Sequence, residues 1–396
     1  MKTMEEAKQE VLSRITEKRL VEVSRELVAI PSETGNEKAV SHFLGNKLKE
    51  MGLEVKWAEG EKDRPNCIGV LRGTTGSPKV QFSGHLDTVS PGDLKKWETD
   101  PYGGAVIGNK IYGLGVMDSK GGGTASVVVA LEALIASGVK LKGDVSIVGT
   151  VDEEIGGRLG MHYLIGNGIV EPDICIYCVH SDMEIKAYFK GLTQYKLTVK
   201  GQTAHGSTPK EGINAINGAI KILAELENGI PYKKHPVLGD HTINYGWIQG
   251  GQKYNVVCDH CEVGIDMRLV PGQSWQQAVA FMETTIANLK KKYPELDASV
   301  EVIQDHDPVE LPEDDHALKI VREAAKEIRG EYPIISGTIA AGDLAAVFKK
   351  GGIPGIGYGP GDLKRGNAHK ENEFLEIDQL IDASKVYAML MLNLCY

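Results

Sequence analysis

The chain has 396 residues, too many for one ordinary hydrophobic core, so two domains are expected. Hydrophobic residues (42%) and charged residues (25%) are at ordinary values, and a formal charge of −10 argues against nucleic acid or an anionic membrane as the partner. No apolar run reaches the roughly 18 residues that span a bilayer, and the start MKTMEEAKQE has no apolar signal-peptide core, so we expect a cytoplasmic protein.

The first half of the chain alternates helical and β-type patterns, which is typical of an α/β domain. Apolar residues at helical spacing predict a helix over residues 4–29 and another over residues 38–51. Short β-type runs are expected after them, at 54–58, 67–71 and 79–83. The alternation continues to about residue 179.

Three groups of potential metal ligands follow β-type runs. His85 and Asp87 come at the end of one run, and residues two apart on a strand face the same side. Asp118 precedes three glycines and a helical pattern, and Asp152-Glu153-Glu154 follows a third apolar run. Each group alone is more often an ordinary surface feature. Because open α/β sheets collect their ligands where strands end, and adjacent acids need a cation, the three together predict a metal site.

Two C-x-x-C pairs have the spacing of a structural zinc site, Cys175 with Cys178 and Cys258 with Cys261. Both pairs lie in β-type runs, where residues three apart point to opposite faces. We therefore expect buried thiols and no structural zinc.

From about residue 187 the pattern changes to β-α-β-β-α-β, the ferredoxin-like split arrangement. The expected strands are 192–200, 241–248, 256–269 and 298–303, and the expected helices are 212–226 and 274–292. The α/β pattern then resumes with a helix at 316–329, a β-type run near 353–358 and a closing helix from Ile377. Residues 187–303 thus read as an insertion between 1–186 and 304–396.

Seven motifs occur in a characteristic order, SGHLDTV, GDLKKWETDPYGG, IYGLGVMDSKGG, DEEIGG, TAHGS, DMRLVPG and AHKENEF. They resemble the di-zinc aminoacylase and carboxypeptidase family, which includes acetylornithine deacetylase, succinyl-diaminopimelate desuccinylase, glutamate carboxypeptidase and bacterial dipeptidases. The resemblance covers nearly the whole chain. It implies a zinc-exopeptidase-like α/β catalytic domain with a mixed sheet (1–186 and 304–396) and an inserted ferredoxin-like lid domain (187–303) that also makes a homodimer.

The resemblance implies two divalent metal ions per subunit, with Zn²⁺ expected and Co²⁺ or Mn²⁺ as alternatives. His85 resembles the ligand of one metal, and Glu154 resembles the ligand of the other. Asp118 resembles the carboxylate that bridges them. His369 resembles the last ligand, on the metal of Glu154.

One ligand position departs from the family pattern. The family usually has Glu or Asp in a segment GEPT, and the matching segment here is CVHSDME. His180 and Asp182 share a strand face, so either could coordinate. His180 is favoured because it lies nearer the replaced acid when counted back from Lys190-Gly191. The remaining alternative is that neither binds and the site holds one metal.

Two further residues near the metals resemble the family's catalytic residues. Glu153 resembles the general base, and Asp87 resembles the carboxylate that fixes the imidazole of His85. In the lid, His205 of TAHGS matches the residue that donates to the oxyanion from the other subunit.

Three more residues match substrate-binding positions. Arg268 and Asn255 match residues that hold the substrate carboxylate and carbonyl, and an arginine fork suits a carboxylate. Gly342 lies in the segment Ala340–Asp343, which aligns with GTSDA, an anion-binding loop of the family.

The implied activity is hydrolysis of an amide bond next to a free carboxylate, by a metal-activated water with Glu153 as general base. The substrate would be a small N-acyl amino acid or a short peptide. Deacylase or carboxypeptidase and dipeptidase remain alternatives, and the acyl group and amino acid stay open. A non-catalytic descendant that binds a small amide is the other class, which Glu153 and the nearly complete ligand set argue against.

Overall fold

The computed structural model describes the chain except for residues 1, 230, 232 and 339–351, so the predicted Gly342 lies outside the described residues. The chain forms two compact units. The first unit comprises 1–187, 311–336 and 342–396, and the second comprises 188–310 and 337–341. The catalytic and lid roles expected for the two parts of the chain remain predictions.

The first unit is built on a mixed sheet whose strands follow the order β1-β2-β6-β3-β7-β17-β8. Their bounds are Glu54–Glu59 (β1), Pro65–Leu71 (β2), Asp144–Thr150 (β6), Lys79–His85 (β3), Ile174–Tyr177 (β7), Gly355–Gly357 (β17) and Ile185–Phe189 (β8). The strands β6, β3, β7 and β17 run parallel, and the others run antiparallel to their neighbours. Two short strands also pair with β8, Val309–Glu310 (β15) and Ile335–Thr338 (β16).

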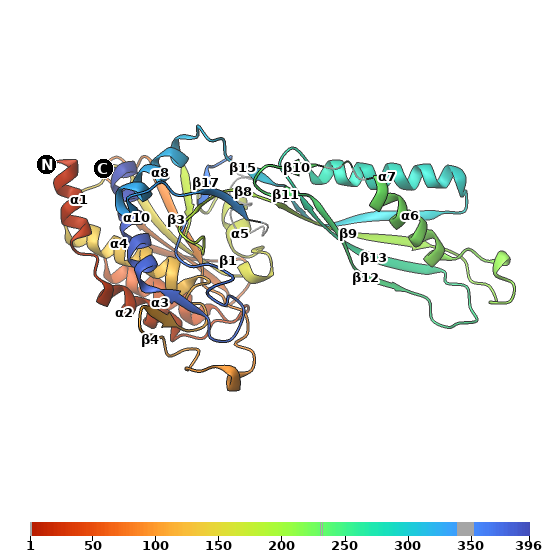
Figure 1. Ribbon diagram of the computed structural model, residues 1–396, viewed down its shortest axis with the longest axis horizontal. Coiled ribbons are helices and arrows are strands. Elements are labelled where there is room, and N and C mark those ends of the chain that lie inside the picture. Colours follow the sequence, from red (N-terminus) through yellow and green to blue (C-terminus); the bar gives the residue numbers. More distant parts are fainter. Residues whose placement is uncertain (1, 230, 232, 339–351) are drawn as a thin grey trace. The chain divides into compact units, whose positions relative to one another are not determined.

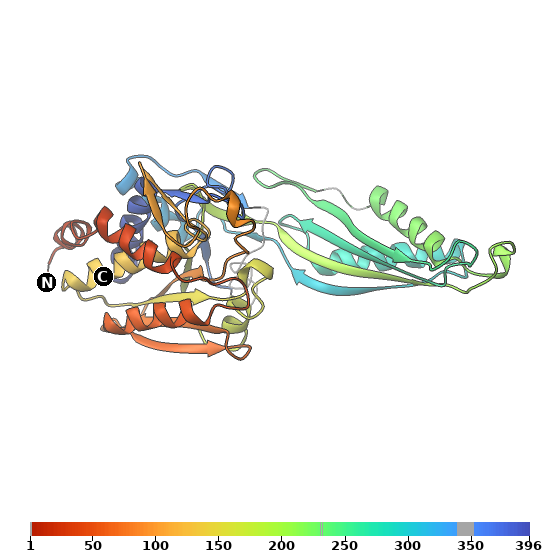
Figure 2. The same ribbon diagram turned by 90° about the horizontal axis from the view of Figure 1, so that it is seen from below.

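Helices cover both faces of this sheet (Figures 1 and 2). They are Met4–Leu12 (α1), Glu17–Val28 (α2), Lys38–Glu50 (α3), Ala125–Ala136 (α4), Met161–Gly166 (α5), His316–Arg329 (α8) and Ile377–Cys395 (α10). Leu48 of α3 lies over Gly69, whereas Met161 of α5 packs in a cluster with Ile68 on the other face. The sheet is therefore the middle of three layers.

The prediction of one helix over residues 4–29 is wrong, because the chain breaks between α1 and α2. Thr16 has extended backbone angles, and its side chain accepts a hydrogen bond from the N–H of Arg19. A threonine in this position caps a new helix. Apolar spacing continues across the break, so periodicity alone did not reveal it.

A small sheet of order β18-β5-β4 lies at the end of the first unit that carries the candidate ligands. Its strands are Ala105–Ile107 (β4), Lys110–Tyr112 (β5) and Phe374–Glu376 (β18), and three short helical turns are Leu94–Lys96 (η1), Lys120–Thr124 (η2) and Glu153–Ile155 (η3). Phe374 pairs with Tyr112, so the segment that carries His369 is held beside the loop that carries Asp118.

The second unit has an antiparallel sheet of order β12-β13-β9-β14. Its elements are Gly191–Lys200 (β9), Pro209–Glu211 (η4), Ala215–Gly229 (α6), Lys234–His235 (β10), Gly239–Asp240 (β11), Thr242–Gly250 (β12), His260–Leu269 (β13), Trp275–Lys292 (α7) and Asp297–His306 (β14). Apart from the short β10 and β11, the chain order is β-α-β-β-α-β with β9 and β13 central, so the predicted ferredoxin-like arrangement is confirmed.

The two helices of the second unit cover one face of its sheet (Figure 1). Alternate residues of β9 and β13, such as Leu197 and Val263, form a core with Ile222 of α6 and Met282 of α7. The residues between them, such as Lys196, point to the opposite face because side chains alternate along a strand. This opposite face is called the outer face below.

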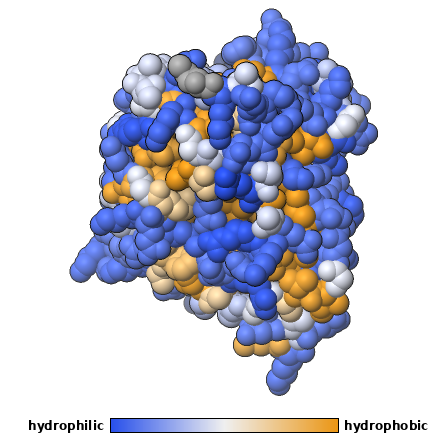
Figure 3. Space-filling model, turned by 90° about the vertical axis from the view of Figure 1, so that its left-hand side faces the viewer, coloured by the Kyte–Doolittle hydropathy of each residue, from blue (hydrophilic) through white to orange (hydrophobic). Residues whose placement is uncertain are grey.

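The surface, the helices and the cysteines can each be compared with what the sequence predicts. The face in Figure 3 is mostly hydrophilic, with separate smaller hydrophobic areas. Among the described residues, no helix is both long and apolar enough to cross a membrane. Each of the six cysteines is a buried free thiol, which confirms the prediction for Cys175, Cys178, Cys258 and Cys261.

Candidate metal centre

Three neighbouring parallel strands of the first unit end at one edge of the sheet, and a candidate ligand follows or ends each one. His85 is the last residue of β3 and pairs with Thr150, the last residue of β6. Glu154 lies in η3, directly after β6, and His180 follows β7. Because the carboxyl ends of β6, β3 and β7 lie together, these side chains meet at the same place.

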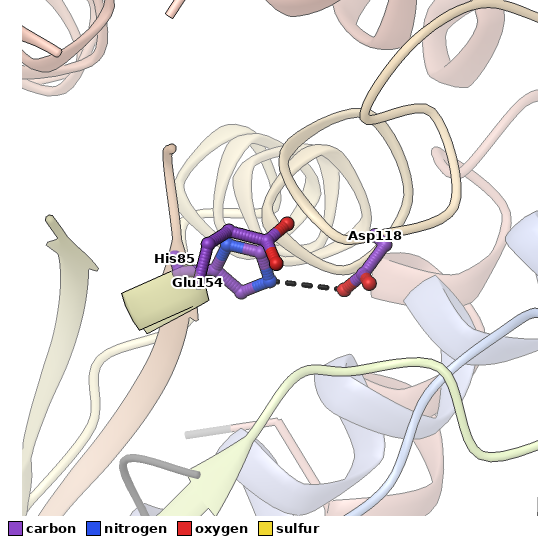
Figure 4. A group of neighbouring side chains, drawn as sticks. All are labelled: His85, Asp118 and Glu154. Atoms are coloured by element: carbon purple, nitrogen blue, oxygen red, sulfur yellow. Dashed lines mark hydrogen bonds and ion pairs between the residues drawn. The ribbon is translucent and has the colours of Figure 1, made fainter. Parts of the chain in front are cut away.

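Asp118 lies at the centre of the group. Its Oδ1 is 3.0 Å from His85 Nε2 and 3.1 Å from His180 Nδ1. Its Oδ2 is 3.2 Å from His369 Nε2, which is also 3.1 Å from Glu154 Oε2. Figure 4 shows His85, Asp118 and Glu154, whose potential ligand atoms lie within 4.8 Å of one another. The fold therefore brings together all five predicted ligands.

This donor set fits divalent cations. Three imidazole nitrogens and two carboxylates converge, and these are ligand types that zinc prefers. His85 and His180 contact one oxygen of Asp118, and His369 contacts the other. A carboxylate with histidines at both oxygens is suited to be shared between two metal ions.

In the metal-free protein, the carboxylates favour protonated imidazoles. Hydrogen bonds to Asp118 and Glu154 raise the pKa of His369 to about 10. Burial opposes a charge on His180, but the charge of Asp118 outweighs it and raises the His180 pKa. The pKa of His85 is also raised, against its burial, chiefly by the charge of Glu153. Since a metal must displace these protons, metal affinity should increase with pH.

His180 and Asp182, the two candidates for the ligand position that departs from the family pattern, have different partners. His180 Nδ1 contacts Asp118, as described above. Asp182 instead accepts a hydrogen bond from Gln379 Nε2 through Oδ1, at 2.8 Å, and forms an ion pair with Arg365. These contacts favour His180 as the ligand.

Asp87 connects His85 to the turn that carries the two adjacent glutamates. The Nδ1 of His85 is 3.0 Å from the Asp87 carbonyl oxygen and 3.5 Å from its Oδ1. The Asp87 carboxylate accepts hydrogen bonds from the backbone N–H groups of Glu153 (3.2 Å) and Glu154 (3.1 Å). The Thr34 hydroxyl also donates to it, at 2.9 Å. This carboxylate can therefore orient a ligand and the predicted base together.

Burial of the Glu153 carboxyl raises its pKa to about 7, against the opposing charge of His85. The nearby carboxylates of Asp118, Glu154 and Asp87 raise the pKa further. A group with a pKa near the working pH transfers protons efficiently in both directions, as a general base that later acts as an acid must.

Glu373, which the motif analysis did not single out, holds the Asp118 loop in place. The side chain is buried, and its carboxylate accepts hydrogen bonds from the N–H groups of Gly115 (3.0 Å), Met117 (2.8 Å) and Asp118 (3.1 Å). Burial raises the pKa of Glu373 to about 7, despite these three donors. Its only sequence signal is its place in AHKENEF, four residues after His369.

A buried ion-pair network holds the acidic turn. Arg64 Nη2 lies 2.5 Å from Glu37 Oε1 and 2.9 Å from Asp152 Oδ1. Asp152 has a φ of 74° and directly precedes Glu153. Since such backbone angles persist only when neighbours enforce them, the pairing with Arg64 helps to fix this turn.

A buried lysine joins two of the ligand loops. Lys120 Nζ donates to the Ile30 carbonyl (2.6 Å) and to Ser32 Oγ (2.9 Å). Ser32 Oγ in turn donates to the Leu86 carbonyl, at 2.7 Å. Leu86 follows His85 and Lys120 lies two residues after Asp118, so this chain of hydrogen bonds couples the two loops.

The three predicted lid residues lie in the second unit. His205 pairs with Val256, and the N–H of Gly206 donates to the Asn255 carbonyl at 2.8 Å, so His205 and Asn255 are neighbours. The N–H of Ser207 donates to His205 Nδ1 at 3.2 Å. The proton of a neutral His205 ring is therefore on Nε2, which can donate to a substrate oxygen.

The comparison with known protein families covers most of the chain. Residues 81–393 match the profile of peptidase family M20/M25/M40. The chain belongs to this family. M20 membership confirms the predicted relationship to the di-metal aminoacylases and carboxypeptidases, and it makes the protein a metallohydrolase.

Individual M20 relatives match over nearly their whole length. The chain is 28% identical to the uncharacterised protein YgeY of Escherichia coli K12, with 93% of each chain covered. It is 27% identical to an acetylornithine deacetylase of Proteus mirabilis, covering 95% of this chain and 96% of the relative. An aminopeptidase PepT structure from Bacillus cereus superposes with a TM-score of 0.80 at 24% identity, covering 96% and 99%. The similarity to PepT confirms the predicted fold class.

Proposed function

We propose that this M20 family member hydrolyses an amide bond next to a free carboxylate, in a small N-acyl amino acid or a short peptide. The observation that carries the proposal is the convergence of His85, His180 and His369 on Asp118, with Glu153 in the adjoining turn. Deacylation of an N-acyl amino acid is the first candidate. Dipeptide cleavage is the second, because solved structures with a similar fold include human carnosine dipeptidase 1 and the dipeptidase Dug1p of Saccharomyces cerevisiae.

In this proposal, five side chains would hold two divalent metal ions, expected to be Zn²⁺. They are His85, Asp118, Glu154, His180 and His369. When bound, the metals would lower the pKa of water and polarise the scissile carbonyl.

The protein's own residues would carry the proton transfers. Glu153 would take one proton from the attacking water and deliver it to the amine nitrogen as the C–N bond breaks. The products are a carboxylic acid and a free amino group, so the hydrolysis consumes one water. His205 Nε2–H would donate to the oxyanion that forms when the water oxygen adds to the carbonyl carbon.

The second unit supports a homodimer in which His205 serves the site of the partner subunit. Arg268 lies eight residues after His260 in β13, a distance of about 26 Å along an extended strand. His205 and Asn255 lie next to the residues that precede the start of β13, so they are near the end of the strand opposite to Arg268. A small substrate is much shorter than this strand, which favours contacts to Arg268 of one chain and to His205 of the other. We propose that Arg268 anchors the substrate carboxylate in its own subunit and that His205 and Asn255 act in the partner's site.

The test begins with metal removal. A chelator should abolish turnover of N-acetyl amino acids, and added Zn²⁺ or Co²⁺ should restore it. A screen of N-acetyl amino acids and dipeptides against the metal-loaded protein would then separate the two candidates. Absence of hydrolysis for every compound, in a protein that holds two metals, would contradict the proposal.

A further inference from the structure

The outer face of the second unit's sheet contains a trough of about 560 Å³. Its lining includes Lys196 of β9, Trp247 of β12, Gly264, Asp266 and Arg268 of β13, and Ile303 of β14. The trough therefore crosses all four strands, and Arg268 is part of its wall.

The apolar part of the trough depends on the pairing of Trp247 with Gly264. The two residues are direct partners on β12 and β13. A Cβ atom on Gly264 would lie 2.0 Å from Trp247 Nε1 and 2.5 Å from its Cε2, so only glycine lets the indole lie on the strand. Trp247 is nevertheless 47% exposed, and Ile303 on the far side is 54% exposed. Exposed apolar side chains within a polar rim are typical of a ligand site.

The charged part of the trough suits a carboxylate. Arg268 Nε donates a hydrogen bond to the Asp266 carboxylate, at 2.9 Å. This bond occupies one edge of the guanidinium and turns the Arg268 side chain back toward Gly264. The other edge is available to a ligand carboxylate. Lys196 is already paired with Glu301, at 2.8 Å, so the remaining guanidinium edge of Arg268 is the group that suits a carboxylate. A ligand with a negative end and an uncharged body is therefore the best match.

The spacing allows a single amino-acid residue of a ligand to reach both the charged part and the apolar part of the trough. Gly264 and Arg268 are four residues apart, about 13 Å along the strand. Because the Arg268 side chain turns back beside Asp266, the gap from the guanidinium to the indole is roughly half of that. A carboxylate at Arg268 would thus place its own side chain against the indole of Trp247.

We propose that Trp247 is a specificity-determining residue, which selects substrates whose carboxylate-bearing residue has an apolar or aromatic side chain. The inference rests on the proposed function, because it takes Arg268 as the carboxylate anchor. Trp247 and Ile303 give this side chain an apolar surface, and the nearby carboxylates of Asp266 and Glu301 are engaged by Arg268 and Lys196, so a cationic side chain such as that of ornithine lacks a counter-charge there. The substrate class is therefore N-acyl or N-aminoacyl derivatives of amino acids like phenylalanine and leucine.

The test compares Trp247→Ala with Ile248→Ala, which removes a 56% exposed side chain from the next position of the same strand. Wild-type protein should hydrolyse N-acetylphenylalanine at least about tenfold more efficiently (kcat/KM) than N-acetylornithine. Trp247→Ala should lower kcat/KM for N-acetylphenylalanine at least about tenfold, mainly through KM, and change N-acetylglycine less than about threefold. Ile248→Ala should leave both values within about twofold.

A binding measurement separates this inference from the proposed function. Calorimetric titration of N-acetylphenylalanine into metal-free protein should give a Kd at least about tenfold weaker for Trp247→Ala than for wild type, whether or not the compound is hydrolysed. If no amide is hydrolysed but this difference appears, the proposed function fails and the trough remains a ligand site. Equal affinities, or wild-type preference for N-acetylornithine, would overturn the inference. Dissociation of a wild-type dimer by Trp247→Ala in sedimentation would overturn it too, because the indole would then be an interface residue.

Discussion

At the scale of single residues, Asp118 organises the candidate centre because both of its oxygens face histidines. The same side chain makes His369 basic and raises the pKa of His180. Its own pKa is held well below the usual range, despite full burial, by the neighbouring imidazoles. These pKa directions favour protonated imidazoles around Asp118 when no metal ion balances the carboxylate charge.

Replacement of Glu153 by alanine should separate catalysis from metal binding. The proposed role of Glu153 is proton transfer, and metal content should therefore remain near the wild-type value. Turnover should fall by at least about a hundredfold, the low end of what a general base contributes. Metal analysis and steady-state kinetics on the same preparation check this. A variant that keeps most of its activity would remove Glu153 from the mechanism.

His180 and Asp182, the two candidates for the ligand position that departs from the family pattern, should behave differently on substitution. His180→Ala should lose about one equivalent of metal per chain, because loss of a direct ligand weakens a site far more than loss of a neighbour. Asp182→Ala is the matched control, since its carboxylate is engaged with Gln379 and Arg365. Both would be measured by metal analysis after dialysis. The reverse result would assign the ligand to Asp182.

At the scale of elements, strand ends explain why much of the centre could be predicted. His85, Asp87, Glu153 and Glu154 follow apolar β-type runs, and the parallel pairing of β3 with β6 brings those runs together. The sequence also indicated the ferredoxin-like order of the second unit from its periodicities. These inferences succeeded because strand and helix periods are local properties of the chain.

The residues that hold the ligand loops in place could not be predicted in the same way. Lys120 and Glu373 are buried ionisable groups whose partners lie in distant segments, namely the Ile30 carbonyl and Ser32 hydroxyl for Lys120 and backbone N–H groups for Glu373. A sequence pattern does not show which carbonyl or N–H group a side chain will reach. The position of Trp247 in the trough could not be predicted either, because it depends on Gly264 in the neighbouring strand.

The link between the two ligand loops can be tested with Lys120→Met. The change keeps the aliphatic length but leaves the Ile30 carbonyl and Ser32 hydroxyl without their donor, which should cost about 1–3 kcal/mol of unfolding free energy. Metal affinity should fall about 10–100-fold, because a residue that supports the ligand loops is lost. Chemical denaturation of the metal-free protein and chelator competition measure the two effects.

The pH dependence of Lys120→Met gives an independent control. Burial lowers the pKa of Lys120 to about 7 in the folded protein, below its ordinary 10.5. Because this pKa is lower in the folded protein than in the unfolded chain, the contribution of Lys120 to the free energy of unfolding is complete above pH 10.5 and is lost as the pH falls through about 7. The wild-type advantage over Lys120→Met should therefore grow from pH 7 to pH 10. Lys38→Met, at an exposed ion pair with Asp63, should change stability little and show no such trend.

At the scale of the whole molecule, the proposed arrangement uses residues of two chains. Every candidate metal ligand lies in the first unit, whereas His205 lies in the second. Arg268 lies near one end of β13, and His205 lies beside the residues that precede its other end. In a two-fold dimer, each chain can give its His205 to its partner while it keeps Arg268 for itself.

Mixing two inactive variants tests this arrangement. Glu153→Ala and His205→Ala proteins, combined under conditions where subunits exchange, should regain activity, because each mixed dimer has one site with an intact Glu153 and an intact His205. With random exchange, about half of the dimers are mixed and each has one working site of two. Recovery should therefore approach roughly a quarter of wild-type activity if the sites act independently. Each variant mixed with itself is the control. Absence of recovery, once exchange is confirmed by mass spectrometry of labelled subunits, would mean that His205 acts within its own chain or outside catalysis.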